Sequence, residues 1–342
     1  MKIGVLTGGG DAPGLNAVIR AFTIRATKQG HEVVGIRRGW AGLLDRVETV
    51  LLTPKDVAGI IDDAGTILLT SRTNPAKNSE EIQKIKNNMS KLGLDAVVAI
   101  GGDDTLGAAK KLSEEGVRVI GVPKTIDNDV PGTDFTFGFF TAVEEATENL
   151  DSLKVTGASH ERTMVVEIMG RHAGWIALYS GIAAAADLIL LPEEPFSLQE
   201  LVEFVKRKKS EGVGSLLIVV AEGAVMKDYT GPITKGVERD QFGNVTLGGI
   251  GEFLAGQLEK ATAVETRFVV PGHIIRGRRP IAFDRVLGTR FGLKAAELVD
   301  QGKFGRMVAM QGTRIIDVDI KQSLSGTRRV SPELLKEKDL IE

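Results

Sequence analysis

Two carboxylates stand next to each other in the segment Gly101-Gly102-Asp103-Asp104-Thr105, which follows an apolar run. Neighbouring carboxylates at the end of a strand suit Mg²⁺, because this ion takes one or two carboxylates together with phosphate oxygens and waters. The alternative is that one of the two only caps the helix that follows. The segment therefore indicates a magnesium site, a helix N-cap, or one residue for each role.

A second pair of carboxylates lies in Pro123-Lys124-Thr125-Ile126-Asp127-Asn128-Asp129, again after an apolar run. Here Asp127 could accept a proton from a hydroxyl group, Asp129 could hold a metal ion and Thr125 could donate to a phosphoryl oxygen. An Asx-turn without chemistry is the alternative. Taken together with the first pair, the segment favours a chemical role.

A glycine-rich turn, Thr7-Gly8-Gly9-Gly10-Asp11-Ala12-Pro13-Gly14, precedes an expected helix at residues 15–28. Such a turn lets backbone N–H groups approach a phosphate at the N-terminus of a helix. A tight turn without a ligand is equally compatible with the pattern. The segment matches neither the dinucleotide pattern G-x-G-x-x-G nor the P-loop, which disfavours a nicotinamide-dependent oxidoreductase.

Several basic residues lie near expected strand ends, namely Arg162, Arg171, Arg267, His273 and Arg276. Arginine binds phosphate through two parallel N–H groups, so a local cluster could capture a sugar phosphate. Any one of these arginines could equally be a solvated surface charge. The chain has four His and no Cys, which argues against a histidine-rich metal site.

Short β-branched runs that end at glycine or a carboxylate, each followed by a helical period, predict parallel βα units. The expected strands are Lys2–Thr7, Asp95–Ile100, Val117–Val122, Thr163–Ile168, Ser215–Val220 and Arg267–Val270. Ligands of open α/β sheets bind beyond the carboxyl ends of the strands, where the polar segments described above lie. A helix should run through Ile82, Ile85 and Met89, with Asn78 near its start and Gly93 at its end. Residues 227–249, rich in glycine, predict an extended loop or hairpin.

Composition excludes several classes of protein. The net charge of −2 and 5% aromatic residues argue against a nucleic-acid binder, and the absence of Cys excludes disulfide scaffolds. The longest apolar stretch, Gly181–Leu191, is too short to span a bilayer, and the N-terminus lacks a signal-peptide pattern. We expect a cytoplasmic protein without membrane contact. A length of 342 residues without a Pro-rich linker favours two lobes between which the chain crosses more than once.

The order of the motifs resembles the 6-phosphofructokinase family from about Met1 to beyond Arg285. In chain order the motifs are Gly8-Gly9-Gly10-Asp11-Ala12-Pro13-Gly14, Gly101-Gly102-Asp103-Asp104-Thr105, Pro123-Lys124-Thr125-Ile126-Asp127-Asn128-Asp129, Met169-Gly170-Arg171, Glu222-Gly223 and Gly272-His273-Ile274-Ile275-Arg276-Gly277. The Thr-Ile-Asp-Asn-Asp segment is highly specific, whereas the glycine turns alone are weak. Catalysis of phosphoryl transfer depends mainly on positioning the reactants and stabilising charge, and these residue types can do both.

The resemblance implies an α/β fold of two Rossmann-like three-layer lobes with the active site in the cleft between them. Residues 1–138 plus 275–325 would bind the phosphoryl donor, and 139–274 plus 326–342 would bind fructose 6-phosphate. The resemblance also implies a Mg²⁺-dependent reaction of glycolysis or gluconeogenesis. It would carry over the following roles: Asp127 as general base, Thr125 and Arg171 on the transferring phosphoryl group, Asp103 and Asp129 on Mg²⁺, Gly10 and Arg72 at the donor, and Arg162, Met169, Gly170, Glu222, Arg267, His273 and Arg276 at the sugar phosphate.

Two positions bear on the identity of the donor. ATP-using members of the family usually carry glycine where this chain has Asp104, and often glycine where it has Lys124. The pair resembles the pyrophosphate-dependent subclass, and Asp104 carries most of this inference because Lys124 also occurs in ATP-using relatives. A carboxylate at 104 would repel the α-phosphate of a nucleotide, while the ammonium at 124 can pair with pyrophosphate. The prediction is a pyrophosphate-dependent enzyme, with ATP as the alternative donor.

In the family, Arg162 and Arg267 reach into the site of a neighbouring subunit, so the resemblance implies a homodimer or homotetramer. The basic effector pocket of the allosteric bacterial enzymes is not reproduced, because Ile24, Glu211 and Val213 occupy matching positions. We therefore expect weak or absent regulation by ADP and phosphoenolpyruvate. The sequence leaves open the direction of flux and whether sedoheptulose 7-phosphate is also accepted.

Overall fold

The structure, a computed structural model, describes residues 1–229, 234–239 and 245–339. The chain forms two compact units. Unit 1 consists of Met1–Ile126, Val130–Thr141 and Arg276–Gly326, and unit 2 consists of the described residues of Asp127–Asp129, Ala142–Ile275 and Thr327–Glu342. Each unit is therefore assembled from three separate pieces of sequence. In the described part of the chain, no helix has the length and apolar character needed to cross a membrane.

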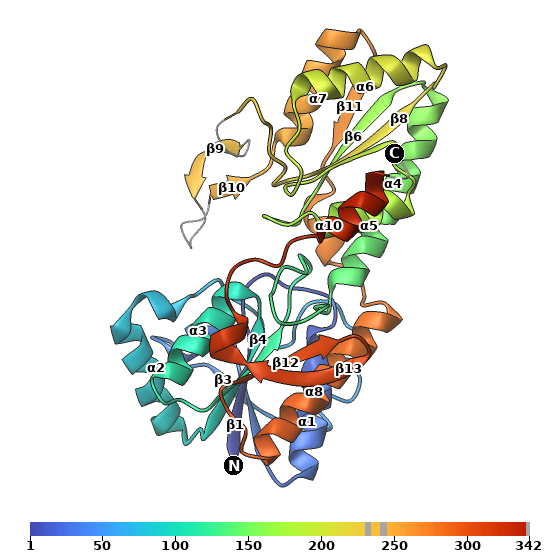
Figure 1. Ribbon diagram of the computed structural model, residues 1–342. Coiled ribbons are helices and arrows are strands. Elements are labelled where there is room, and N and C mark those ends of the chain that lie inside the picture. Colours follow the sequence, from blue (N-terminus) through green and yellow to red (C-terminus); the bar gives the residue numbers. More distant parts are fainter. Residues whose placement is uncertain (230–233, 240–244, 340–342) are drawn as a thin grey trace. The chain divides into compact units, whose positions relative to one another are not determined.

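Unit 1 is built on a seven-stranded sheet in the order β13-β12-β5-β4-β1-β2-β3 (Figure 1). The central strands β1 (Lys2–Thr7), β2 (Glu32–Ile36), β4 (Ala96–Gly101), β5 (Val119–Pro123) and β12 (Arg306–Gln311) are parallel to their neighbours in this group. The edge strands β3 (Thr49–Leu52) and β13 (Arg314–Asp319) pair antiparallel to β2 and β12. The parallel centre brings the ends of β1, β4 and β5 to the same edge of the sheet.

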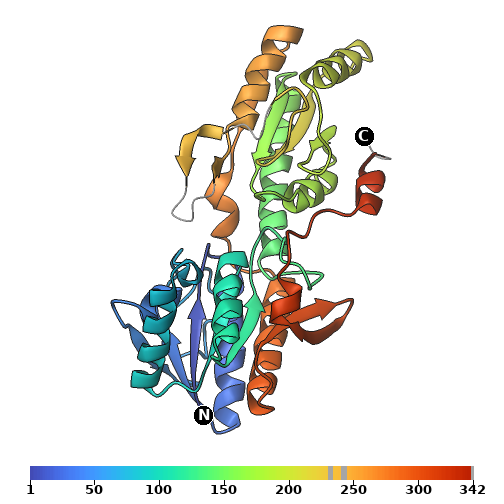
Figure 2. The ribbon, with the colours of Figure 1, turned by 60° about the vertical axis from the view of Figure 1, so that its left-hand side comes forward.

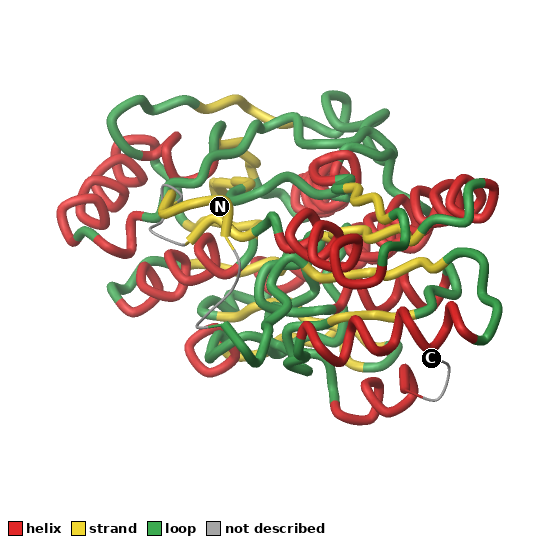
Figure 3. Tube along the Cα trace, turned by 90° about the horizontal axis from the view of Figure 1, so that it is seen from above, coloured by secondary structure: helices red, strands yellow, loops and turns green. Residues whose placement is uncertain are grey.

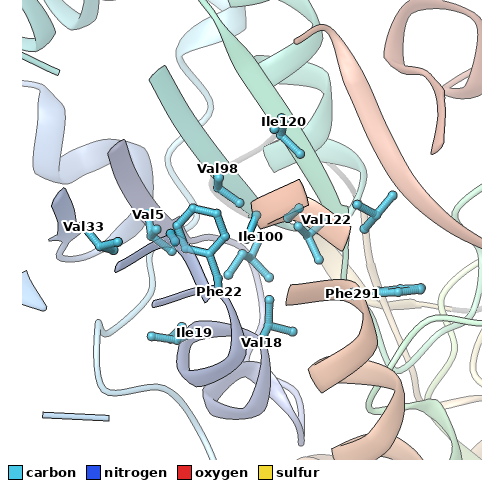
Figure 4. Close-up of a cluster of buried hydrophobic side chains, with 14 of the residues drawn as sticks. Val5, Val18, Ile19, Phe22, Val33, Val98, Ile100, Ile120, Val122 and Phe291 are labelled. Atoms are coloured by element: carbon cyan, nitrogen blue, oxygen red, sulfur yellow. The ribbon is translucent and has the colours of Figure 1, made fainter. Parts of the chain in front are cut away.

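Helices cover both faces of this sheet, because side chains alternate between the faces along each strand. In β4, Val98 and Ile100 pack on the face covered by α1 (Leu15–Lys28) and α8 (Ala282–Asp300), as Figure 4 shows. Val97 and Ala99 face α2 (Ser79–Leu92) and α3 (Asp103–Glu114). Unit 1 is thus a three-layer α/β structure.

The helices α1 and α8 are far apart in the sequence but lie side by side (Figure 2). Glycines on α8 permit this close approach. A Cβ atom at Gly292 would lie 2.6 Å from the carbonyl oxygen of Val18, and one at Gly288 would lie 2.9 Å from that of Gly14. Gly14 is the N-cap of α1 with φ of 101°, so this glycine turn both starts the helix and contacts α8.

Unit 2 contains a four-stranded sheet in the order β11-β6-β8-β7, all parallel. Its strands are β6 (Thr163–Ile168), β7 (Leu188–Leu190), β8 (Leu216–Ala221) and β11 (Thr266–Val269). One face packs on α6 (Leu198–Ser210) and α7 (Ile250–Thr262). The helix α5 (Trp175–Ala183) contacts β7 and β8 and contributes no side chain to that cluster. The unit also contains α10 (Pro332–Asp339) and, from Ala142 onward, α4 (Phe139–Ser159). Figure 3 marks the described helices in red and the strands in yellow.

The α/β fold class predicted from the sequence is confirmed. Each predicted strand is present with its ends within two residues of the observed ones, and the helix predicted at 15–28 is α1. Asn78 caps α2 by accepting from the Glu80 N–H, and Gly93 ends it in the left-handed region. Within the predicted loop or hairpin at 227–249, β9 (Thr234–Arg239) and β10 (Val245–Leu247) pair antiparallel. Residues 230–233 and 240–244 of this segment lie outside the described residues.

Candidate active site

The glycine turn after β1 is fastened to two neighbouring segments. The Gly8 N–H donates to the carbonyl of Ile100 at the end of β4, and the Gly9 N–H donates to the carbonyl of Ser71, both at 2.9 Å. A Cβ atom at Gly8 would lie 2.5 Å from Oγ1 of Thr105, so only glycine fits at this position. The turn therefore presents bare backbone at the carboxyl edge of the sheet.

Two cationic side chains predicted to bind ligands reach this turn within unit 1. Nζ of Lys124 donates to the carbonyl of Gly10, and Nη1 of Arg276 donates to the carbonyl of Asp11 at 3.0 Å. A Cβ atom at Gly10 would lie 2.9 Å from Nη1 of Arg276. The Lys124 side chain is 3% exposed, so its positive charge is held in the interior beside the turn. Such a charge attracts phosphate oxygens more strongly than a solvated one.

The carboxylates Asp103 and Asp104 occupy the first turn of α3. The N-cap of this helix is Gly102, and no side chain caps it, so the interpretation of either aspartate as the N-cap residue is wrong. Their position still favours the negative charge, because the N-terminal end of a helix carries a partial positive charge. Oδ1 of Asp104 accepts a hydrogen bond of 2.9 Å from Nδ2 of Asn74.

Asn74 is not among the site residues that the sequence predicted. It ends a segment, residues 70–74, whose other end lies against the glycine turn, because Oγ1 of Thr70 donates to the carbonyl of Gly9 at 2.6 Å. The predicted donor-binding residue Arg72 lies in this segment with an exposed side chain. No sequence pattern linked Asn74 to Asp104, because the two residues are 30 positions apart.

The segment Thr125–Asp129 is buried throughout. Thr125 is 8% exposed, Asp127 5% and Asp129 6%, and Oγ1 of Thr136 donates to the carbonyl of Thr125 at 2.8 Å. Thr125 belongs to unit 1 and Asp127–Asp129 to unit 2. Burial of two carboxylates in so short a segment costs free energy unless they interact with polar or charged groups.

Arg328 is a second residue that sequence reasoning missed. Its backbone N–H donates to the carbonyl of Asp129 at 2.8 Å, and its Nη1 donates to the carbonyl of Asn128 at 3.0 Å. Its guanidinium also lies over the ring of Trp175, 4.1 Å from the centroid. Within unit 2 the C-terminal segment thus holds the Asp127–Asp129 backbone in place.

In unit 2, the turn after β6 carries the predicted residues Met169, Gly170 and Arg171. Oε1 of Glu222 accepts from the backbone N–H groups of Gly170 at 3.1 Å and Arg171 at 2.8 Å. A Cβ atom at Gly223 would lie 1.9 Å from the carbonyl oxygen of Arg171, so the backbone at Gly223 packs directly against this turn. The structure therefore brings these predicted residues together.

Burial raises the pKa of the Glu222 carboxyl above its ordinary value. The negative charges of Asp127 and Glu167 act in the same direction, whereas the N–H groups of Arg171 and Gly170 oppose the shift. A carboxyl group so placed is suited to a polar ligand that brings hydroxyl groups, because it can accept hydrogen bonds or donate one when protonated.

Arg162 and Arg267 also come together on unit 2. Nε of Arg162 lies 2.8 Å from Oε1 of Glu265, and Nη2 of Arg267 lies 2.5 Å from the same oxygen. The two arginine ion pairs lower the pKa of Glu265. His273, in the short 3₁₀ segment Gly272–Arg276, is exposed.

Mg²⁺ needs one or two carboxylates beside its waters and phosphate oxygens. Asp103 and Asp129 each carry a carboxylate, the kind of oxygen ligand that this ion takes. Asp103 is exposed in unit 1, and Asp129 is buried in unit 2. Among the described residues, no group of three or more His, Asp or Glu side chains gathers as a metal site of its own.

The fold and these residues define an α/β protein in which glycine turns, carboxylates and basic side chains follow parallel strands. Comparison with known proteins gives the family. The phosphofructokinase family model matches residues 2–299, so the chain belongs to the phosphofructokinase family and is an enzyme, a phosphotransferase.

Relatives of both donor types are similar along their whole length. A pyrophosphate–fructose 6-phosphate 1-phosphotransferase of Amycolatopsis methanolica is 50% identical, over 100% of this chain and 99% of its own. An ATP-dependent 6-phosphofructokinase 3 of Streptomyces coelicolor is 46% identical, over 96% of both chains. Among solved structures, phosphofructokinase from Saccharomyces cerevisiae matches with a TM-score of 0.80 at 31% identity, over 94% of this chain and 45% of its own. This chain thus spans less than half of that yeast chain.

Proposed function

We propose that this enzyme transfers a phosphoryl group from pyrophosphate to the 1-hydroxyl of fructose 6-phosphate, reversibly and with Mg²⁺. The products are fructose 1,6-bisphosphate and phosphate. The observation that carries the proposal is the carboxylate of Asp104, half-buried and hydrogen-bonded to Asn74 beside the glycine turns of unit 1. The relative at 50% identity is named for this reaction, which supports the same conclusion.

In this proposal unit 1 binds the donor. The backbone of Gly10 and the side chains of Arg72 and Lys124 would hold the two phosphates of pyrophosphate. Lys124 donates to Gly10 in the structure and is buried, so its charge acts in a poorly screened environment. A nucleotide would bring its α-phosphate and ribose toward Asp104, where the negative charge and the volume of the side chain oppose it.

The chemical step would rest on Asp127, Thr125 and Arg171. Asp127 takes the proton of the 1-hydroxyl as the oxygen bonds to phosphorus, and the bond from phosphorus to the bridging oxygen of pyrophosphate breaks. Phosphate leaves, and the proton remains on Asp127 until it is released. Thr125 and Arg171 would stabilise the charge on the transferring phosphoryl oxygens. Bound Mg²⁺, held by Asp103 and Asp129, would neutralise charge on the phosphates.

Fructose 6-phosphate would be bound by residues of unit 2 and by Arg276. Glu222, Met169 and Gly170 would contact the sugar hydroxyls. His273 and Arg276 would hold the 6-phosphate, together with Arg162 and Arg267 from a neighbouring subunit. The pairing of Arg162 and Arg267 through Glu265 supports this assignment, because it keeps two guanidinium groups together as a unit. The active form would then be a homodimer or a homotetramer.

A coupled assay with fructose 6-phosphate and Mg²⁺ tests the donor, comparing pyrophosphate with ATP at matched concentrations. We expect activity with pyrophosphate and little with ATP. Asp104→Gly should raise kcat/KM for ATP at least tenfold, as expected when about 1.4 kcal/mol of repulsion is removed. Wild-type activity with ATP alone would overturn the proposed donor and favour the second candidate, an ATP-dependent 6-phosphofructokinase, which the relative at 46% identity supports.

A further inference from the structure

The segment 70–74 connects two parts of the proposed donor site in unit 1. At one end, Oγ1 of Thr70 donates to the carbonyl of Gly9 at 2.6 Å, and the carbonyl of Ser71 accepts from the Gly9 N–H at 2.9 Å. At the other end, Asn74 bonds to Asp104 at 2.9 Å. The segment therefore ties the glycine turn of β1 to the first turn of α3.

The amide of Asn74 serves two partners at once, one with each of its polar atoms. Its Oδ1 accepts from the N–H of Ala76 at 3.1 Å and caps the short 3₁₀ helix Pro75–Lys77. Its Nδ2 donates to Oδ1 of Asp104. The orientation of the amide is unambiguous, because a backbone N–H can only donate and an ionised carboxylate can only accept. The hydrogen bond from Ala76 orients the Asn74 side chain, and Asn74 in turn orients the Asp104 carboxylate.

We propose that Asn74 is a positioning residue for donor selection, holding the Asp104 carboxylate in the orientation that excludes a nucleotide. The inference rests on the proposed function and adds a residue to it. A hydrogen bond to a charged group is stronger than one between neutral groups, so its loss should free Asp104 to rotate away from the donor. Selection against ATP by repulsion requires a fixed charge, because a mobile carboxylate can yield to the larger donor.

The test uses Asn74→Ser, which separates the two tasks of the side chain. Serine is a good N-cap, so the bond from Ala76 is kept, but it has no amide to reach Asp104, and the charge is unchanged. We expect the ratio of kcat/KM for ATP to kcat/KM for pyrophosphate to rise at least fivefold, and KM for fructose 6-phosphate to stay within twofold. Asn78→Ser is the matched control, because Asn78 caps α2 by accepting from Glu80 at 2.9 Å and is the next cap along the chain. It should leave the ratio unchanged.

A double-mutant cycle tests whether Asn74 acts through Asp104. In the Asp104→Gly background the carboxylate is absent, so Asn74→Ser should change the donor ratio by less than twofold. An equal effect of Asn74→Ser in both backgrounds would overturn the proposal, and so would an unchanged ratio in the single variant. Thermal unfolding of each variant shows whether it is folded, and a change in stability without a change in donor ratio would reduce Asn74 to a helix cap.

The failure of this inference can be distinguished from the failure of the proposed function. The wild-type comparison of pyrophosphate with ATP decides the proposed function alone. If the wild type uses ATP, KM for ATP is measured for the wild type, the two single variants and the double variant. Non-additive effects of Asn74→Ser and Asp104→Gly would then still support the coupling of the two side chains, and additive effects would refute it.

Discussion

At Asn128 and Arg171 the backbone adopts left-handed conformations, with φ of 53° and 55°. Asparagine tolerates this region because its short amide can bond locally, but arginine pays about 1–2 kcal/mol. At Arg171 this cost is offset by the hydrogen bond that its backbone N–H donates to Glu222. Both residues lie in segments to which we assign chemistry, where a strained backbone can position side chains that a relaxed turn would not.

Asp284 offers a pH test at the scale of a single residue. Burial raises the pKa of its carboxyl from the ordinary 3.8 to about 6, although the N–H and hydroxyl of Thr141 donate to it at 2.7 and 2.6 Å. The folded state therefore holds this proton more tightly than the unfolded state. Its contribution to the free energy of unfolding is fully present below about pH 4 and is lost as the pH rises through about 6.

The measurement is urea unfolding of the wild type and Asp284→Asn at a series of pH values. The amide cannot ionise but keeps a carbonyl to accept from Thr141. Between pH 4 and pH 7 the stability of the variant relative to wild type should improve by up to about 3 kcal/mol. Parallel stability curves for the two proteins would contradict the assignment.

At the scale of the element, the turn after β6 packs against Gly223, which follows β8. Gly223→Ala would place a Cβ atom 1.9 Å from the carbonyl oxygen of Arg171, so the turn must shift. We expect a loss of about 1–3 kcal/mol in stability and of about 10²-fold in kcat/KM for fructose 6-phosphate. Steady-state kinetics and urea unfolding measure the two effects.

The matched control is Gly256→Ala in α7 of the same unit. A Cβ atom there would meet nothing within 4 Å, and the residue lies inside a helix. Alanine should stabilise the protein by up to about 1 kcal/mol and leave the kinetics unchanged. Equal kinetics for wild type and Gly223→Ala would show that the turn does not position Arg171 for substrate.

The strands β1, β4 and β5 and the helices α1 and α2 could be predicted because their signals are local. The strand at 2–7 and the helix at 15–28 are bounded by glycines and follow clear hydrophobic periods, and Asn78 and Gly93 mark the ends of α2. The hairpin of β12 and β13 was missed, although Gly312, with φ of 56° at the turn, stands between two apolar runs. The three residues of β7 are too few to show a period.

The site could be predicted only as far as its residues lie in recognisable segments. The glycine turns, the carboxylates and the Met169–Arg171 turn were found this way. Asn74 and Arg328 were not, because their roles depend on partners 30 and 200 residues away. Nothing near either residue in the sequence distinguishes it from a surface side chain, and only the folded backbone brings it to its partner.

At the scale of the whole molecule, the proposed sharing of sites between subunits can be tested by complementation. Asp127→Asn and Arg162→Ala should each abolish nearly all activity when alone. If Arg162 serves the site of a neighbour, a mixed dimer contains one site that lacks neither residue. One of the two sites in the purified mixed dimer is then intact, so its activity should be about half of that of the wild type.

The readout is the activity of the doubly tagged mixed oligomer, purified through one affinity tag on each variant. A matched control pairs Asp127→Asn with Asp127→Asn, which has no intact site to recover. Activity in the mixed oligomer no higher than in that control would place Arg162 at the site of its own chain.

The interleaving of the two units has a consequence for synthesis on the ribosome. Strand β12 pairs with β5 through Arg306 and Ile120, so the sheet of unit 1 cannot be completed until almost the whole chain has been made. At typical translation rates β5 waits about 10–40 s for its partner. During that time the edge of β5 and the apolar face later covered by α8 are open to other chains. The nascent protein should therefore depend on chaperones that bind apolar surface, and slowing translation beyond β5 should lower the yield of folded enzyme.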